Sequence, residues 1–207
     1  MSYQIIDNFL TEDNFLKVRN SILNPKFSWH MTPYVTYESK LEETIKVTSS
    51  YYFTHLFYNR FFVSPECNIF TDILNQLEVK SLIRIKGNLY PSTDNIEYHA
   101  EHNDYDYEHK GAIFYLNTND GFTILEDGTK IESISNRMLL FDPSKSHNST
   151  TCTNDKCRVN VNFNFFWNLR IMKNTKELEE AKKVIITLKR LGWEVDDIQR
   201  FINLPRE

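Results

Sequence analysis

Three side chains in this sequence have the types and the spacing of a metal site. His102 and Asp104 lie two residues apart, and His147 follows much later in the chain. Two histidines and one carboxylate can hold a ferrous ion on one face, which leaves the opposite positions open for an organic acid and O2. Because residues two apart on an extended strand point the same way, His102 and Asp104 are expected to reach the same ion.

Two stretches of alternating polar and apolar residues accompany this triad. The polar residues that share a face are Arg158, Asn160, Asn162 and Asn164 in one stretch, and Arg84, Lys86, Asn88 and Tyr90 in the other. An antiparallel sheet with one solvated face produces such a pattern, and so does the polar interior of a small barrel. Arg158 suits a charged ligand such as 2-oxoglutarate, because guanidinium stays charged and binds carboxylate through two parallel hydrogen bonds.

The elements that must position these side chains fall into three parts. Residues 1–78 are predicted to be mainly helical, because Thr11 and Pro65 each precede an apolar pattern of helical period. Residues 79–168 are predicted to be short strands, because alternation recurs between turn signals, and residues 169–207 to be C-terminal helices. Many short strands favour a sandwich or a barrel. The turn signals are Asn119-Asp120-Gly121, Asp127-Gly128, Asp142-Pro143 and Asn154-Asp155.

The composition bounds the class of protein. The 207 residues are 41% hydrophobic, enough for a single domain over residues 1–207 with a sizeable core. A net charge of -4 argues against a broad surface for nucleic acid, and no apolar run is long enough to cross a bilayer. The N-terminus does not resemble a secretory signal, and three cysteines do not suggest a disulfide framework, so we expect a cytoplasmic protein. Cys152 and Cys157 are spaced like half of a zinc site, but ordinary thiols beside a turn are expected.

Together these residues resemble the Fe(II)/2-oxoglutarate-dependent dioxygenases, and specifically their prolyl-hydroxylase-like branch. The resemblance covers about residues 82–168, and it implies a double-stranded β-helix, or jelly roll, within an α+β fold that has N-terminal helices and a C-terminal helical tail. His102, Asp104 and His147 match the iron ligands of that family, and Arg158 matches the arginine that binds 2-oxoglutarate.

Further matches concern the pocket for the cosubstrate. Tyr90 matches a tyrosine that lines it, and Tyr115 matches one that hydrogen-bonds the same carboxylate as the arginine. Asn88, with Tyr90, is similar to a pattern in the nucleic-acid-dealkylating branch, although the acidic net charge argues against that substrate. The sequence departs from the family at one turn, where a glycine pair is reduced to Gly121.

Rival ligands are present in the same region. His99 and Glu101 form a His-x-Glu pair just before His102. His109 is expected either in a loop or in contact with one of the residues that bind the metal. We favour His102 with Asp104, because aspartate is the common carboxylate in triads of the family that the chain resembles. The acidic segment 101–108 suits either a cationic substrate or a solvated loop.

The resemblance implies the reaction and its cofactors. These are Fe(II), 2-oxoglutarate as cosubstrate and O2, with ascorbate as a supporting reductant, for a hydroxylation that releases succinate and CO2. The expected substrate is a prolyl residue of a peptide or a small molecule. Two alternatives from other classes are a jelly-roll metal protein with non-oxidative chemistry, such as an isomerase or hydrolase, and a non-catalytic binding module. The sequence predicts no oligomeric state.

Overall fold

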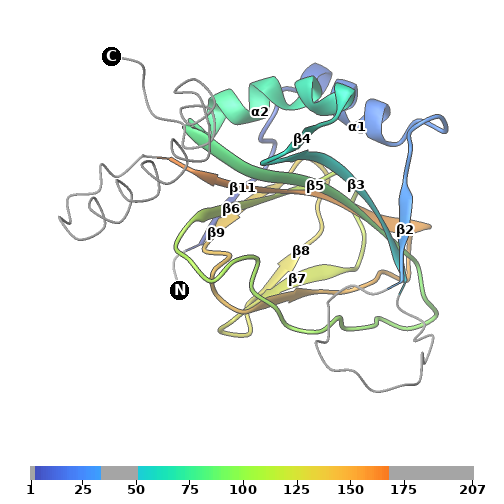
Figure 1. The fold of residues 1–207 in the computed structure, drawn as a ribbon. Helices are drawn as coiled ribbons and strands as arrows, with labels where there is room; N and C mark the ends of the chain where they lie inside the picture. Colours follow the sequence, from blue (N-terminus) through green and yellow to red (C-terminus); the bar gives the residue numbers. More distant parts are fainter. Residues whose placement is uncertain (1–2, 34–50, 168–207) are drawn as a thin grey trace, which may run out of the picture. The chain divides into compact units, whose positions relative to one another are not determined.

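The computed structural model describes residues 3–33 and 51–167 of the chain (Figure 1). The described residues up to Phe166 belong to one compact unit. The helices that the sequence predicts over residues 169–207 lie outside the described residues. Within the described ranges, none of the helices has the length and the apolar character needed to cross a membrane.

Two antiparallel sheets face each other and form the jelly roll that the sequence predicted (Figure 1). The larger sheet has the strand order β1-β9-β6-β11-β5-β3-β2, with β4 paired to β3, and the smaller has the order β10-β7-β8. The strands of the larger sheet are β1 (Gln4–Ile6), β2 (His30–Thr32), β3 (Tyr52–Asn59), β4 (Phe62–Val63), β5 (Ser81–Pro91), β6 (Lys110–Tyr115), β9 (Met138–Phe141) and β11 (Cys157–Phe166). Those of the smaller sheet are β7 (Phe122–Leu125), β8 (Lys130–Glu132) and β10 (His147–Ser149).

Helices cover the outer face of the larger sheet (Figure 1). They are α1 (Glu12–Ile22), the short 3-10 helix η1 (Pro65–Phe70) and α2 (Thr71–Gln76). Between them and the sheet lies the main hydrophobic core, in which the ring of Phe70 packs edge-on against Phe57 and Phe163. Burying such aromatic rings contributes much of the stability of a domain of this size. The opposite face of the larger sheet is therefore free to line a site.

Residues 1–78 hold strands as well as helices, where the sequence predicted mainly helices. The helices after Thr11 and from Pro65 are present, but the aromatic stretch of residues 52–59 forms β3. The physical reason is that aromatic residues favour a pleated, half-buried surface. Pairing of β3 with β5 then buries Tyr52 and Phe57, which a separate helix would leave without this sheet contact.

The pairing of β5 with β11 explains the two alternating stretches of the sequence. In this register, each polar residue on the inner face of β5 lies opposite a polar residue of β11. The opposed pairs are Arg84 with Asn164, Lys86 with Asn162, Asn88 with Asn160, and Tyr90 with Arg158. Asn88, Asn160 and Arg158 are at most 2% exposed, so this face is the interior of the jelly roll and not a solvated surface.

Candidate metal centre and ligand pocket

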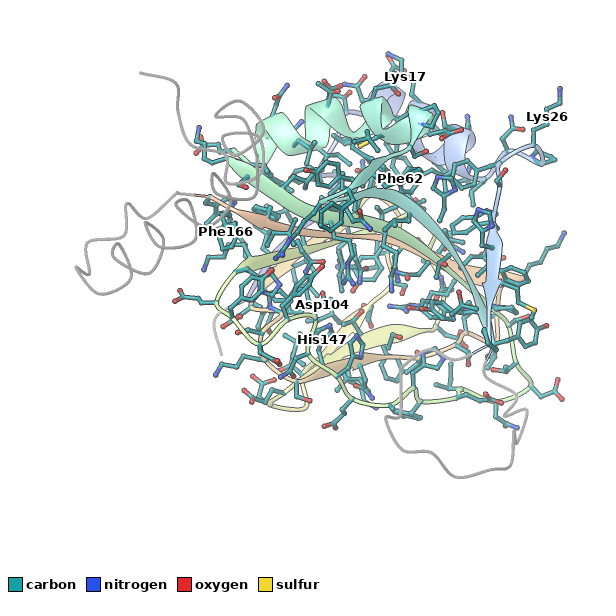
Figure 2. The ribbon with its side chains drawn as sticks, viewed as in Figure 1. Lys17, Lys26, Phe62, Asp104, His147 and Phe166 are labelled. Atoms are coloured by element: carbon teal, nitrogen blue, oxygen red, sulfur yellow. The ribbon has the colours of Figure 1, made fainter. Side chains whose placement is uncertain are left out.

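The structure brings His102, Asp104 and His147 together between the two sheets. One ligand atom from each of these side chains lies within 4.8 Å of the others. Figure 2 shows Asp104 and His147 in the space between the larger and the smaller sheet. The cluster joins residues that are far apart in the sequence, which makes it a candidate metal centre with two histidines and one carboxylate on one side.

Backbone hydrogen bonds hold the two histidines opposite each other. The amide of His102 donates to the carbonyl of His147 and the amide of His147 donates to the carbonyl of His102, each at 3.0 Å. The amide of Asp104 donates to the carbonyl of Pro143 at 2.9 Å, which fixes the third residue of the cluster beside the turn before β10. The separation of the three side chains is therefore set by the chain itself.

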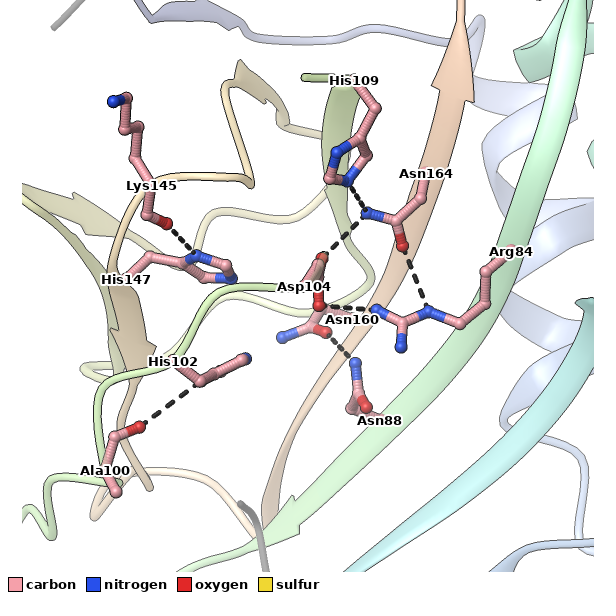
Figure 3. A network of polar contacts seen from close by, with 10 residues as sticks. All are labelled: Arg84, Asn88, Ala100, His102, Asp104, His109, Lys145, His147, Asn160 and Asn164. Atoms are coloured by element: carbon pink, nitrogen blue, oxygen red, sulfur yellow. Dashed lines mark hydrogen bonds and ion pairs between the residues drawn. The ribbon is translucent and has the colours of Figure 1, made fainter. Parts of the chain in front are cut away.

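The ring nitrogens of both histidines are arranged as metal ligands require. His147 Nδ1 lies 3.0 Å from the carbonyl of Lys145, and His102 Nδ1 lies 3.4 Å from the carbonyl of Ala100 (Figure 3). Because a carbonyl oxygen only accepts, each Nδ1 carries the proton and each Nε2 offers its lone pair. His147 Nε2 is buried and has no hydrogen-bond partner among the described residues. A divalent ion with nitrogen and oxygen ligands fits this donor set.

Asp104 is held by two side chains of the β5–β11 pair. Arg84 Nη2 donates to Oδ1 at 2.6 Å and Asn164 Nδ2 donates to Oδ2 at 2.8 Å (Figure 3). Arg84 Nε also donates to Asn164 Oδ1 at 3.1 Å, which closes a triangle around the carboxylate. Burial opposes ionisation of Asp104, but the positive charge of Arg84 and the hydrogen bond from Asn164 act against it, and the pKa of Asp104 lies well below the usual range. The ligand is therefore an anion at neutral pH.

His102 is neutral under the same conditions. Burial, followed by the neighbouring His147, lowers the pKa of His102 to about 4, although Asp104 acts in the opposite direction. A neutral imidazole is the form that binds a metal ion, because protonation would occupy the lone pair. Metal binding at neutral pH therefore requires no loss of a proton from His102.

The rival ligands take other positions. His99 Nδ1 hydrogen-bonds Ser149 Oγ at 2.8 Å and its ring stacks on Tyr90, so it does not join the cluster. Glu101, the other half of that rival pair, accepts a hydrogen bond from Ser146 Oγ at 3.1 Å. His109 Nε2 accepts from Asn164 Nδ2 at 3.1 Å, and it thereby orients the amide that holds Asp104 (Figure 3).

A pocket opens beside the candidate metal centre. It is lined by residues of both sheets, among them Lys86, Asn88, Tyr90, Thr123, His147 and Asn162. Three buried atoms without a hydrogen-bond partner among the described residues belong to this lining: Asn88 Oδ1, Asn162 Oδ1 and His147 Nε2. Buried acceptors are rarely left unpaired in native proteins. Their grouping in one pocket indicates a place for a ligand.

Arg158 and Tyr115 lie behind one wall of this pocket. Arg158 Nη2 donates to Thr123 Oγ1 at 2.9 Å, and the hydroxyl of Tyr115 donates to the same atom at 2.8 Å. Arg158 also donates to Ser133 Oγ and to the carbonyl of Thr150, and it packs over the ring of Tyr90. The predicted cosubstrate residues Tyr90 and Asn88 thus line the pocket, whereas Arg158 and Tyr115 reach it through Thr123.

Gly121 is required by the close approach of Arg158. A Cβ atom at this position would lie 2.5 Å from the carbonyl oxygen of Thr151 and 2.7 Å from Cδ of Arg158. Any other residue would therefore push the turn before β7 away from β11. Gly121, the one glycine at this turn, therefore allows Thr123 to come within hydrogen-bond distance of the guanidinium group of Arg158.

Sequence reasoning placed Arg84 and Asn164 on polar faces but gave them no role, and it did not single out Thr123. The signal for the first two was the alternation itself, since a buried polar face needs partners for its charges. Their specific partner, Asp104, comes from a distant segment, so the alternation alone did not identify it. No pattern around Thr123 distinguished it from an ordinary strand residue.

Comparisons with known proteins identify the fold. No family model and no curated protein matches the sequence. Among solved structures, an oxidoreductase of the 2OG-Fe(II) oxygenase family from Burkholderia pseudomallei is similar, with a TM-score of 0.57 and 10% identity over 80% of this chain and 85% of that chain. A prolyl hydroxylase from Trichoplax adhaerens, in complex with a peptide fragment of the hypoxia inducible factor oxygen degradation domain, has a TM-score of 0.54 and 13% identity over 84% and 87%.

A third similar structure is SnoN, a non-heme alpha ketoglutarate dependent epimerase from nogalamycin biosynthesis. Its TM-score is 0.50, at 7% identity over 79% of this chain and 76% of that chain. The chain thus has the fold of the Fe(II)/2-oxoglutarate oxygenases, as the sequence resemblance predicted. At such low identities the likeness concerns the fold, and the chemistry rests on the side chains of the site.

The contacts of Asp104 predict a loss of metal affinity when Asn164 is changed. Asn164→Ala removes the donor to Oδ2, and we expect Mn(II) affinity to fall by about tenfold to a hundredfold, because residues that orient metal ligands contribute on that scale. Titration calorimetry of the metal-free protein measures the change. Asn95→Ala, at an exposed position, is the matched control. Equal affinities of the two variants would contradict the role given to Asn164.

The buried His99 predicts a pH dependence of stability. Burial, aided by the positive charge of Arg158, lowers the pKa of His99 in the folded protein to about 4, from its ordinary value of 6.5. Between these values the unfolded chain binds a proton that the folded protein does not, so the free energy of unfolding falls as pH drops from 6.5 to 4. Urea unfolding of the metal-free protein should show the decline, and it should be shallower in His99→Gln. A slope that His99→Gln leaves unchanged would rule this origin out.

Proposed function

We propose that this protein is an Fe(II)- and 2-oxoglutarate-dependent oxygenase that hydroxylates an organic substrate and releases succinate and CO2. The observation that carries the proposal is the cluster of His102, Asp104 and His147, whose ligand atoms lie within 4.8 Å of one another. His147 Nε2 is buried with no hydrogen-bond partner among the described residues, and the carboxylate is held by Arg84 and Asn164. Two histidines and one carboxylate on one face are the ligand set of non-haem iron oxygenases.

In this proposal, some side chains of the pocket bind the metal and others orient the reactants. His102, Asp104 and His147 hold Fe(II), which supplies the oxidising chemistry by activating O2 with electrons from the decarboxylation of 2-oxoglutarate. The protein orients the reactants and keeps water away from them, since Tyr90 and Asn88 line a pocket enclosed between two sheets. Asp104, as an anion, offsets part of the charge of the metal.

The surroundings of Arg158 support a dicarboxylate as cosubstrate. This guanidinium is fully buried, and among the described residues it forms no ion pair. Its hydrogen bonds to Ser133, Thr150 and Thr123 use three of its five N–H groups. Because an unpaired buried charge is costly, an anionic group of a ligand is the natural counter-ion.

Thr123 connects this charge to the pocket. Its hydroxyl oxygen accepts from both Arg158 and Tyr115, so both lone pairs are used and the hydroxyl hydrogen is left to donate. Thr123 lines the pocket, and we assign its hydroxyl, with Arg158 behind it, to the far carboxylate of 2-oxoglutarate. The substrate class proposed is a peptide or a small molecule. The peptide complex of the Trichoplax adhaerens prolyl hydroxylase supports the former.

Succinate formation tests the proposed reaction. The purified protein, supplied with Fe(II), ascorbate, O2 and 2-oxoglutarate, should produce succinate slowly even without its substrate. Asp104→Ala should abolish this activity, because the open-face geometry requires the carboxylate. If the wild type forms no succinate, 2-oxoglutarate is titrated into the anaerobic ferrous protein. A wild type that neither forms succinate nor binds 2-oxoglutarate would disprove the proposal.

Arg158→Ala tests the assignment of the cosubstrate end. We expect the affinity for 2-oxoglutarate to fall by about tenfold to a hundredfold, because the buried positive charge behind Thr123 that attracts the carboxylate is lost, and hydrogen bonds that involve a charged group contribute about 1.5–3 kcal/mol. Anaerobic titration of the metal-loaded protein measures it, and Arg158→Lys separates the loss of charge from the loss of the planar fork. If Arg158→Ala binds 2-oxoglutarate as tightly as the wild type does, Arg158 does not bind the cosubstrate.

A further inference from the structure

Lys86 is a second buried cation of the pocket, and the proposed reaction leaves it without a role. It lies in the middle of β5, on the inner face, and it lines the pocket together with His102 and His147. Its Nζ lies 5.7 Å from the ring centroid of Tyr52. Among the described residues, Lys86 Nζ takes part in no hydrogen bond or ion pair, and the aromatic ring of Tyr52 lies beside it.

Among the described residues, no acidic side chain is available to pair with Lys86 alone. Asp104 is the acidic side chain that interacts with Lys86, but its two oxygens accept from Arg84 and Asn164 and it also belongs to the metal cluster. Burial, and then the like charge of Arg84, lower the pKa of Lys86 to about 8. An oxyanion bound beside this amine would favour its charged form.

The cosubstrate carboxylate assigned to Arg158 lies at the other end of the pocket. In the β5–β11 register Arg158 is opposite Tyr90, whereas Lys86 is opposite Asn162. Tyr90 and Lys86 are four residues apart on one strand, which separates their Cα atoms by ~13 Å. Lys86 also interacts electrostatically with Asp104 and His102, so we place Lys86 at the metal end of the pocket and Arg158 at the far end.

Two unpaired acceptors flank Lys86. Asn162 Oδ1, directly across the strand pair, and Asn88 Oδ1, two residues along β5, are buried without a partner among the described residues. The 2-oxoglutarate dianion has no N–H or O–H group, so it satisfies neither acceptor. A molecule that satisfies this part of the pocket combines an oxyanion with a hydrogen-bond donor.

We propose that Lys86 binds an oxyanion of the organic substrate, and that Asn162 and Asn88 accept hydrogen bonds from N–H or O–H groups next to it. The substrate class is then a carboxylate- or phosphate-bearing molecule with such a donor, in place of the cationic substrate that the acidic segment 101–108 suggested. This inference rests on the proposed function, since it assumes that metal and 2-oxoglutarate fill the remainder of the site.

The test compares an acid with its neutral analogue. N-acetylglycine and N-acetylglycinamide differ in charge but share size and an N–H donor, and the protein is loaded with Mn(II) and 2-oxoglutarate without O2. Paramagnetic relaxation of the probe protons by Mn(II) reports binding next to the metal. We expect N-acetylglycine to bind more tightly than its amide. We expect Lys86→Met to weaken its binding by about tenfold or more, because a charge-assisted hydrogen bond is lost.

Control variants make the outcome specific. Lys156→Met removes the same charge from an exposed position and should leave binding unchanged. Lys86→Arg keeps the charge and should restore the preference for the acid, which guards against misfolding of Lys86→Met. Inorganic phosphate is added as a competitor. Displacement of N-acetylglycine by phosphate at a lower concentration than by acetate points to a phosphate-bearing substrate, and the reverse order points to a carboxylate.

Three results would overturn the proposal. The first is equal binding of acid and amide by the wild type, and the second is equal binding of the acid by Lys86→Met and the wild type. The third is a tenfold loss of 2-oxoglutarate affinity in Lys86→Met, which would assign Lys86 to the cosubstrate. All three leave the proposed function standing, because the wild type still binds 2-oxoglutarate. A wild type that binds no 2-oxoglutarate instead refutes the proposed function.

Discussion

The antiparallel pairing of β5 with β11 is the constraint on which the site depends. A side-chain period of two means that one register sets every polar residue of one strand against a polar residue of the other. A slip of β5 by one residue would turn Arg84 and Lys86 toward the hydrophobic core under the helices. The same register presents Phe163 and its neighbours to that core. Core and site are thus two faces of a single strand pair.

The buried guanidinium groups of Arg84 and Arg158 are tolerated because each has hydrogen-bond partners in the interior. Arg84 is neutralised by Asp104, and Asn164 and His109 complete the hydrogen bonds around the carboxylate. Arg158 is hydrogen-bonded to neutral oxygens and lies against aromatic rings, an arrangement that orients the charge without cancelling it. A low-dielectric interior strengthens the attraction of such a charge for an anion that enters.

Local alternation predicted the polar strand faces and a sandwich or barrel, and the spacing of His102 and Asp104 predicted that their side chains lie together. The jelly roll was predicted from the resemblance to a known family. The sequence did not predict β3, whose strand state depends on an edge offered by the distant β5. Nor did it predict that Asn164 and Arg84 hold Asp104, or that Thr123 stands between Arg158 and the pocket, since these contacts join segments far apart in the chain. A local sequence pattern shows whether a segment has the period of a strand or of a helix. Which strand or side chain that segment contacts is decided by tertiary packing.

The paired backbone of His102 and His147 has a consequence for metal selectivity. Reciprocal amide–carbonyl bonds fix the backbone of the two histidines, and each ring is held through its Nδ1 by a carbonyl of its own segment. For ligands of this kind intrinsic affinity rises from Mn(II) through Fe(II) to Cu(II), with Zn(II) also ahead of iron. Two nitrogens and one oxygen held in this way therefore give iron no thermodynamic advantage. Which ion would occupy the proposed site then depends on the metals that the surroundings make available, and zinc bound there would give an inactive form of the proposed oxygenase.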